Sequence, residues 1–152
     1  QSMEKNYPNI EVSYEFVDAV AMRLVQWPNS YDVLITSNLF GDILTDEASV
    51  ISGSMGLMPS ASVGSKNALY EPIHGSYPEA AGKNIANPIA SILSLSMMLE
   101  HSFNLKKESE IINNAVEESL KNKYVTPDLS SDRNSYSTDQ VGDYIVDFIE
   151  KN

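Results

Sequence analysis

One stretch constrains this chain more than any other: an apolar run, a short polar turn and a helix that carries two aspartates. Residues 31–35 have a strand-type pattern, and a helix is predicted from 42 to about 51. Residues four apart on a helix lie one turn above each other, so Asp42 and Asp46 face the same way. Such a carboxylate pair suits a hard cation such as Mg²⁺, which otherwise keeps water and substrate oxygens as ligands. Alternatively, Asp42 caps the helix or interacts with its positive end, and Asp46 is merely solvated; spacing alone leaves both interpretations open.

Composition limits the classes of partner. The chain has 152 residues, enough for one domain with a sizeable core. A net charge of −11 and a pI near 4.4 argue against a nucleic-acid or anionic membrane surface. No apolar stretch reaches membrane-spanning length and no signal segment is apparent. The absence of cysteine excludes disulfides and fits a reducing compartment, so we expect a cytoplasmic protein with no nucleic-acid or membrane partner.

The remaining pattern predicts an α/β protein. Residues 10–14 alternate as in a strand, and 57–63 and 68–70 are predicted to be extended. Helices are expected over four further segments: 15–26, 88–102, 107–122 and one opened by the capping-box spacing of Ser137 and Gln140. Gly53 and Gly56 interrupt regular structure, as in a turn or hinge.

Residues 71–88 form a stretch rich in glycine and proline, which predicts a long structured loop. No GxGxxG phosphate-binding fingerprint occurs in the chain. The loop offers the side chains of His74, Glu79 and Asn87, which are plausible partners for an adenine edge and ribose hydroxyls. Alternatively, His74 is an ordinary loop histidine and Asn87 is the N-cap of a helix that starts at Pro88.

Two long motifs carry a resemblance to a known family. The strings SNLFGDILTDEASVISGSMGLMPSASVG (37–64) and LYEPIHGSYPEAAGKNIANP (69–88) closely resemble the isocitrate and isopropylmalate dehydrogenases, metal-dependent decarboxylating dehydrogenases of β-hydroxyacids. The resemblance runs from about Val17 to the C-terminus and is strongest to the isopropylmalate branch, which belongs to leucine biosynthesis. Alternatives are the isocitrate and homoisocitrate branches, a non-catalytic regulatory subunit, or an acidic structural module whose carboxylates are incidental.

The resemblance implies a metal site shared between subunits of a homodimer. In the family pattern, the aspartate of the string VDAVAM, here Asp18, supplies a third metal carboxylate from the partner subunit. Asp18, Asp42 and Asp46 are therefore expected to bind Mg²⁺ or Mn²⁺. Asp18 is also the expected catalytic residue of this sequence, acting together with the metal. The metal in turn binds a malate-type substrate.

The resemblance also implies that the loop covers the adenosine half of NAD. The expected cofactor-binding residues are His74, Gly75, Ser76, Glu79 and Asn87. Tyr77 and Glu79 depart from the commoner small residue and aspartate of the family, which leaves the hydrogen-bond distances of the longer glutamate open.

The implied fold is the C-terminal portion of a two-domain enzyme with a mixed sheet flanked by helices. Residues 1–52 are expected to belong to the dimer-forming, metal-site domain, and 53–152 to the cofactor-carrying domain. The family's catalytic lysine and tyrosine and its substrate-binding arginines are expected upstream of this sequence. We therefore expect the 152-residue chain to be inactive alone.

Overall fold

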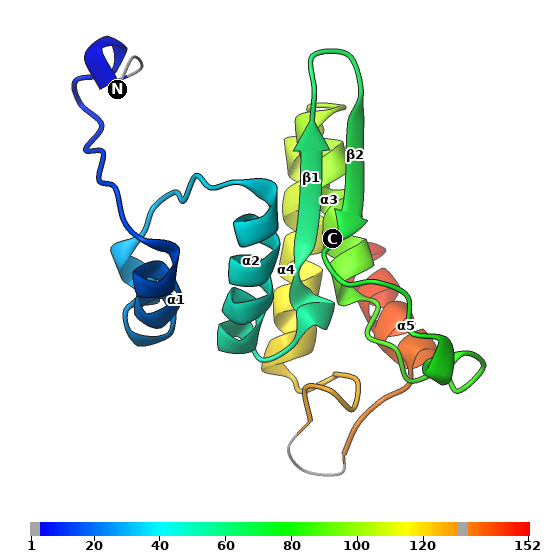
Figure 1. Ribbon diagram of the computed structural model, residues 1–152. Helices are drawn as coiled ribbons and strands as arrows, with labels where there is room; N and C mark the ends of the chain where they lie inside the picture. The colour runs from blue at the N-terminus through cyan, green and yellow to red at the C-terminus, as the bar shows by residue number, and fades with distance from the viewer. Residues whose placement is uncertain (1–3, 131–133) are drawn as a thin grey trace. The chain divides into compact units, whose positions relative to one another are not determined.

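The computed structural model describes residues 4–130 and 134–152, and in this part the chain forms five α-helices and a two-stranded sheet (Figure 1). The α/β class predicted from the sequence is therefore confirmed. The helices and strands are α1 Val17–Gln26, α2 Asn38–Ser52, β1 Pro59–Val63, β2 Ala68–Pro72, α3 Ile89–His101, α4 Lys106–Lys121 and α5 Thr138–Ile149. Short 3₁₀ helices η1 to η4 lie at Glu4–Asn6, Pro28–Ser30, Met55–Leu57 and Pro78–Ala80.

The chain divides into two compact units, residues 1–48 and 49–152. The domain assignment made from the sequence, with its boundary after Ser52, remains a prediction. No helix among the described residues is both long and apolar enough to cross a membrane.

The second unit has a core built by its three helices. Its buried members are Ile89 of α3, Ala115 and Val116 of α4, and Val141 and Ile145 of α5. Ala115 and Val116 are adjacent on α4, and Val141 and Ile145 lie four positions apart on α5, so each helix buries one face. The helices predicted over 88–102 and 107–122 are confirmed with boundaries moved by one residue.

The capping box predicted at the start of the last helix is also present. Ser137 Oγ accepts a hydrogen bond from the Gln140 N–H, and Gln140 Oε1 accepts one from the Ser137 N–H. These reciprocal bonds satisfy backbone donors that the first turn of a helix leaves unpaired. The sequence alone therefore fixes where α5 begins.

The sheet of the second unit is an antiparallel hairpin that packs on α3 (Figure 1). The register pairs Pro59 with Pro72 and Val63 with Ala68. These strands correspond to the two extended segments predicted after the glycine-containing turn. The hairpin leads directly into the loop that holds the predicted cofactor residues.

The first unit has a smaller core. Val20 and Leu24 of α1 and Leu44 of α2 are its buried residues, with Tyr31 packed against them. Glu15 accepts hydrogen bonds from Arg23 Nη1 at 2.6 Å and from the Tyr31 hydroxyl at 2.8 Å. These contacts secure α1 and the segment after it.

Two strand predictions in the first unit are wrong. Residues 10–14 and 31–35 have no strand assignment, and the side chains of Val33 and Ile35 are 79% and 96% exposed. A strand exists only where a neighbour completes its hydrogen-bond ladder, and no described segment pairs with either run. An apolar pattern of strand type is therefore not sufficient to form a strand at either place.

The interpretation of Asp42 as a helix cap is also wrong. Helix α2 begins at Asn38, not at Asp42, and the Gly41 N–H donates to the Ser37 carbonyl at 2.8 Å. No acidic residue lies in the first turn. Asp42 therefore lies in the second turn, where orphan backbone donors no longer need its side chain.

Candidate functional site

The three predicted metal-binding aspartates lie on two helices of the first unit. Asp18 is in the first turn of α1, and its Oδ1 accepts a hydrogen bond from the Ala19 N–H at 2.8 Å. Asp42 and Asp46 lie one turn apart on α2, and Asp42 Oδ2 accepts a hydrogen bond from Asn38 Nδ2 at 3.2 Å. All three residues are exposed. Accessible carboxylate oxygens are the donor type that Mg²⁺ and Mn²⁺ prefer, so the residues fit such an ion.

Within residues 4–130 and 134–152, no three histidine, cysteine or acidic side chains gather closely enough to hold a metal. The expected arrangement takes Asp18 from a partner subunit, and one chain would therefore bring only Asp42 and Asp46 together. The assignment of all three aspartates to one ion remains a prediction.

The first half of the predicted cofactor loop presents its polar groups to solvent. His74 is half-buried, with Nδ1 3.0 Å from the Gly75 carbonyl oxygen, while Gly75 and Ser76 are exposed. Glu79 is exposed in the short helix η4, next to Ala80, which is 7% exposed. The buried alanine holds this turn against the unit and leaves the glutamate carboxylate accessible.

The second half of the loop is bonded to the start of α5. Asn84, which has a left-handed backbone with φ 55°, accepts the Thr138 N–H on its carbonyl at 3.0 Å. Its side chain donates to Asp139 Oδ2 at 2.9 Å and accepts the Asp139 N–H at 3.2 Å. Thr138 Oγ1 donates to the Ala86 carbonyl at 2.6 Å. These bonds fix residues 84–86 independently of any ligand.

Asn87, the last predicted cofactor residue, has both ends of its side-chain amide engaged. Its Oδ1 accepts the Ile89 N–H at 3.0 Å, as an N-cap side chain does, although α3 starts one residue later than the N-cap interpretation placed it. Its Nδ2 donates to Asp128 Oδ2 at 3.0 Å. The N-cap position of α3 is Pro88, so the N-cap interpretation of Asn87 is off by one residue, although the Asn87 side chain still satisfies the Ile89 N–H. The sequence gives no signal for the contact with Asp128.

Asp128 is a residue that the sequence did not reveal. Besides Asn87, its carboxylate accepts hydrogen bonds from the hydroxyls of Ser54 and Thr126. Partial burial raises the pKa of Asp128, but the bonds from Ser54, Thr126 and Asn87, together with its own backbone N–H, outweigh burial and leave the pKa below its usual value. An aspartate after a proline is ordinary loop sequence, so no local signal marks it.

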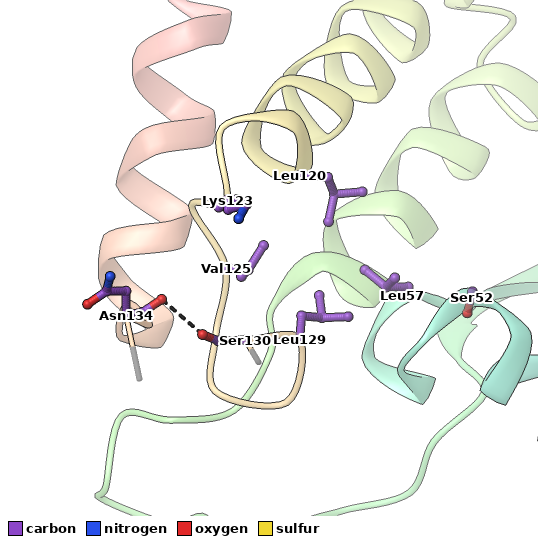
Figure 2. A pocket seen from close by; sticks show the side chains of 8 residues that line it. All are labelled: Ser52, Leu57, Leu120, Lys123, Val125, Leu129, Ser130 and Asn134. Atoms are coloured by element: carbon purple, nitrogen blue, oxygen red, sulfur yellow. Dashed lines mark hydrogen bonds between the residues drawn. The ribbon is translucent and has the colours of Figure 1, made fainter. Parts of the chain in front are cut away.

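Two of the hollows among the described residues contain no predicted site residue. One, of about 240 Å³, lies in the second unit with Leu57, Leu120 and Leu129 in its wall (Figure 2). The other, of about 300 Å³, lies in the first unit between Phe16, Ile35 and Leu44. The predicted ligands thus project from surfaces instead of lining either hollow.

Comparisons with known proteins agree with the motifs. The family model described as isocitrate/isopropylmalate dehydrogenase matches residues 1–145. The 3-isopropylmalate dehydrogenases of Aquifex aeolicus and Thermotoga maritima are 50% and 51% identical over 97% of this chain. The chain covers 41% and 42% of those two relatives, so it spans about two fifths of their length.

Solved structures give the same result for the fold. A crystal structure of isocitrate dehydrogenase from Methylococcus capsulatus matches 97% of this chain with a TM-score of 0.93 and 42% identity, and the match covers 43% of that protein. A β-decarboxylating dehydrogenase from Thermococcus kodakarensis matches 96% of this chain with a TM-score of 0.82 and 40% identity, over 42% of its own length. The chain therefore belongs to the isocitrate/isopropylmalate dehydrogenase family.

Proposed function

We propose that the full-length protein is a 3-isopropylmalate dehydrogenase that oxidises and decarboxylates its substrate with NAD⁺ and a divalent metal ion, in leucine biosynthesis. The observation that carries this proposal is about 50% identity to 3-isopropylmalate dehydrogenases over nearly the whole chain. We further propose that the protein acts in the cytoplasm as a homodimer and that the 152-residue chain is inactive alone.

Three aspartates serve the metal in this proposal. Asp42 and Asp46 of one subunit and Asp18 of its partner would hold Mg²⁺ or Mn²⁺. At that place the ion would supply Lewis-acid chemistry for the hydroxyl and carboxylate oxygens of the substrate. The exposure of all three residues supports the proposal, since each carboxylate is accessible to a ligand. The aspartates also supply the charge that keeps a divalent cation near an anionic substrate.

The loop over residues 71–88 would bind the adenosine half of NAD⁺, and the nicotinamide at the other end of the cofactor would supply the hydride acceptor. The exposed carboxylate of Glu79 accepts hydrogen bonds from the ribose hydroxyls, as acidic residues do in other dinucleotide sites. His74 and Asn87 provide polar groups for the adenine, and Gly75 and Ser76 allow the loop to approach the cofactor. The exposure of Gly75, Ser76 and Glu79 supports this arrangement.

The test is steady-state kinetics of the full-length protein with NAD⁺ and Mg²⁺ or Mn²⁺, following NADH absorbance. Substrates are 3-isopropylmalate, isocitrate and homoisocitrate at matched concentrations. The proposal requires the highest kcat/KM for 3-isopropylmalate. A higher value for isocitrate or homoisocitrate would move the protein to another branch of the family. No turnover with any of them, in a protein that binds Mn²⁺ by calorimetry, would favour a regulatory subunit.

A further inference from the structure

The carboxylate of Asp128 joins three segments that lie far apart in the sequence. Its Oδ2 accepts hydrogen bonds from Ser54, 74 positions earlier, and from Asn87, 41 positions earlier. Its Oδ1 accepts the Thr126 hydroxyl at 2.6 Å. Both oxygens are therefore used inside the protein, although the residue itself is exposed. All these residues belong to the second unit.

These contacts fix the orientation of the Asn87 amide. If the amide were turned over, its oxygen would face Asp128 Oδ2 at 3.0 Å, so that two acceptors would meet. Its nitrogen would then face the Ile89 N–H, so that two donors would meet. Either mismatch leaves polar groups unpaired in a half-buried place, which is costly. Both bonds thus select the same orientation.

Gly56 limits the position of the same side chain. A Cβ on Gly56 would lie 2.7 Å from Asn87 Cβ, closer than such atoms approach, so only glycine fits here. The Gly56 N–H donates to Ser54 Oγ at 3.0 Å, and the same hydroxyl donates to Asp128. The glycine-containing turn therefore packs against one side of the Asn87 side chain, while Asp128 accepts a hydrogen bond from the Asn87 amide.

We propose that Asp128 is a positioning residue for the cofactor: it holds Asn87 so that the remaining N–H and lone pair of the Asn87 amide are presented to the adenosine half of NAD⁺. A carboxamide has two donors and two acceptor sites, and Asp128 and Ile89 each use one of them. One donor and one acceptor remain, which is the kind of pair that an adenine edge offers in return. This inference rests on the proposed function, in which Asn87 contacts the cofactor.

The test uses the full-length enzyme and two probes, NAD⁺ and AMP, with Kd measured by calorimetry. Asp128→Ala should raise both Kd values about tenfold, because Asn87 loses the contact that orients it. The KM for NAD⁺ should rise equally, while kcat and the KM for the hydroxyacid substrate stay within about twofold. Asp128→Asn should restore binding to within about threefold. Its amide oxygen can accept from Ser54 and Asn87, and its amide nitrogen can donate to the Thr126 hydroxyl.

Asp139→Ala is the matched control. Asp139 is also an exposed aspartate that accepts a hydrogen bond from an asparagine of the same loop, but that asparagine is Asn84. The Asp139→Ala variant should change the Kd for AMP less than threefold. A double-mutant cycle adds a second criterion: in an Asn87→Ala background, Asp128→Ala should have no further effect on AMP binding.

Unchanged Kd values in Asp128→Ala would overturn the inference, and so would an equal rise in Asp139→Ala, which would mean general anchoring of the loop. If Asp128→Ala does not fold, by circular dichroism, Asp128→Ser replaces it. Serine can still pair with Thr126 but is too short to reach Asn87. Failure of the unmutated enzyme to bind NAD⁺ or AMP would instead overturn the proposed function. If the unmutated enzyme turns over NAD⁺ but Asp128→Ala leaves both Kd values unchanged, only the positioning role is overturned.

Discussion

The two units differ in how many internal contacts hold their proposed site residues in place. The second unit has a core of five buried residues from three helices, and its loop is bonded to α5 and to Asp128. Among its described residues, the first unit has a core of three buried residues, and its apolar residues Phe16, Val33 and Ile35 are 84%, 79% and 96% exposed. We expect exposed apolar surface of this extent to pack against further protein surface.

The difference indicates which contacts shape the two groups of proposed site residues: the metal half (Asp18, Asp42 and Asp46) and the cofactor half (the loop over residues 71–88). The loop proposed to bind the cofactor is shaped by contacts within the second unit. The aspartates proposed to bind the metal stand on helices whose outer faces are apolar: Met22 and Val25 on α1 and Ile43 on α2 are each more than half exposed. We therefore expect the metal half of the site to depend on further protein surface, and the cofactor half much less.

The largest expected effect is on the metal half. In the full-length protein, Asp42→Asn or Asp46→Asn should lower kcat/KM by at least about 100-fold, because each removes a charged ligand from a divalent ion. The melting temperature should hardly change, since both side chains are exposed. Kinetics and Mn²⁺ calorimetry measure the loss. Wild-type activity in either variant would remove that aspartate from the site.

A pair of core substitutions tests the contrast in packing. Ile145→Ala in the second unit should cost about 2–5 kcal/mol of unfolding free energy, because Ile145 is 2% exposed. In the full-length protein, Ile35→Ala should cost at least about 2 kcal/mol, because we expect further protein surface to cover this apolar side chain there. Chemical denaturation measures both. A cost below about 0.5 kcal/mol for Ile35→Ala would mean that this surface stays open.

The cofactor half should discriminate between NAD⁺ and NADP⁺. The 2′-phosphate of NADP⁺ brings about −1.5 to −2 charges toward the Glu79 carboxylate, so kcat/KM should favour NAD⁺ by at least about tenfold, or about 1.4 kcal/mol. Glu79→Lys should reduce that preference. The nearby Lys83 could attract the 2′-phosphate and weaken this preference. However, no ion pair between Lys83 and Glu79 occurs among the described residues. Equal use of both cofactors by the unmutated enzyme would end this role for Glu79.

The smallest expected effect is complementation between subunits. Full-length Asp18→Asn and Asp42→Asn proteins, each inactive, should regain about a quarter of wild-type activity after equal mixing and exchange, because half of the dimers are hybrids with one intact site of two. Each protein mixed with itself is the control. No recovery, in subunits shown by mass spectrometry to have exchanged, would place Asp18 outside a shared site. A strictly monomeric enzyme in sedimentation would do the same.

Local sequence determined the elements whose stabilising contacts are themselves local. The capping box of Ser137 and Gln140, the apolar stripe of α4 and the spacing of Asp42 and Asp46 depend on residues three or four apart, so each was readable from the chain. The two family motifs added the membership of the isocitrate/isopropylmalate dehydrogenase family, which no spacing rule disclosed.

Tertiary structure decided what depends on distant partners. Residues 31–35 carry a strand pattern, but a strand forms only with a hydrogen-bonded neighbour, and none is described. Asn87 could be read as a cap from its neighbour Pro88. That its amide also meets Asp128, and that Gly56 packs against it, follows from loop closures of 41 and 31 positions. Such contacts leave no periodic trace in the sequence, because they are set by how the packed helices bring the loops together.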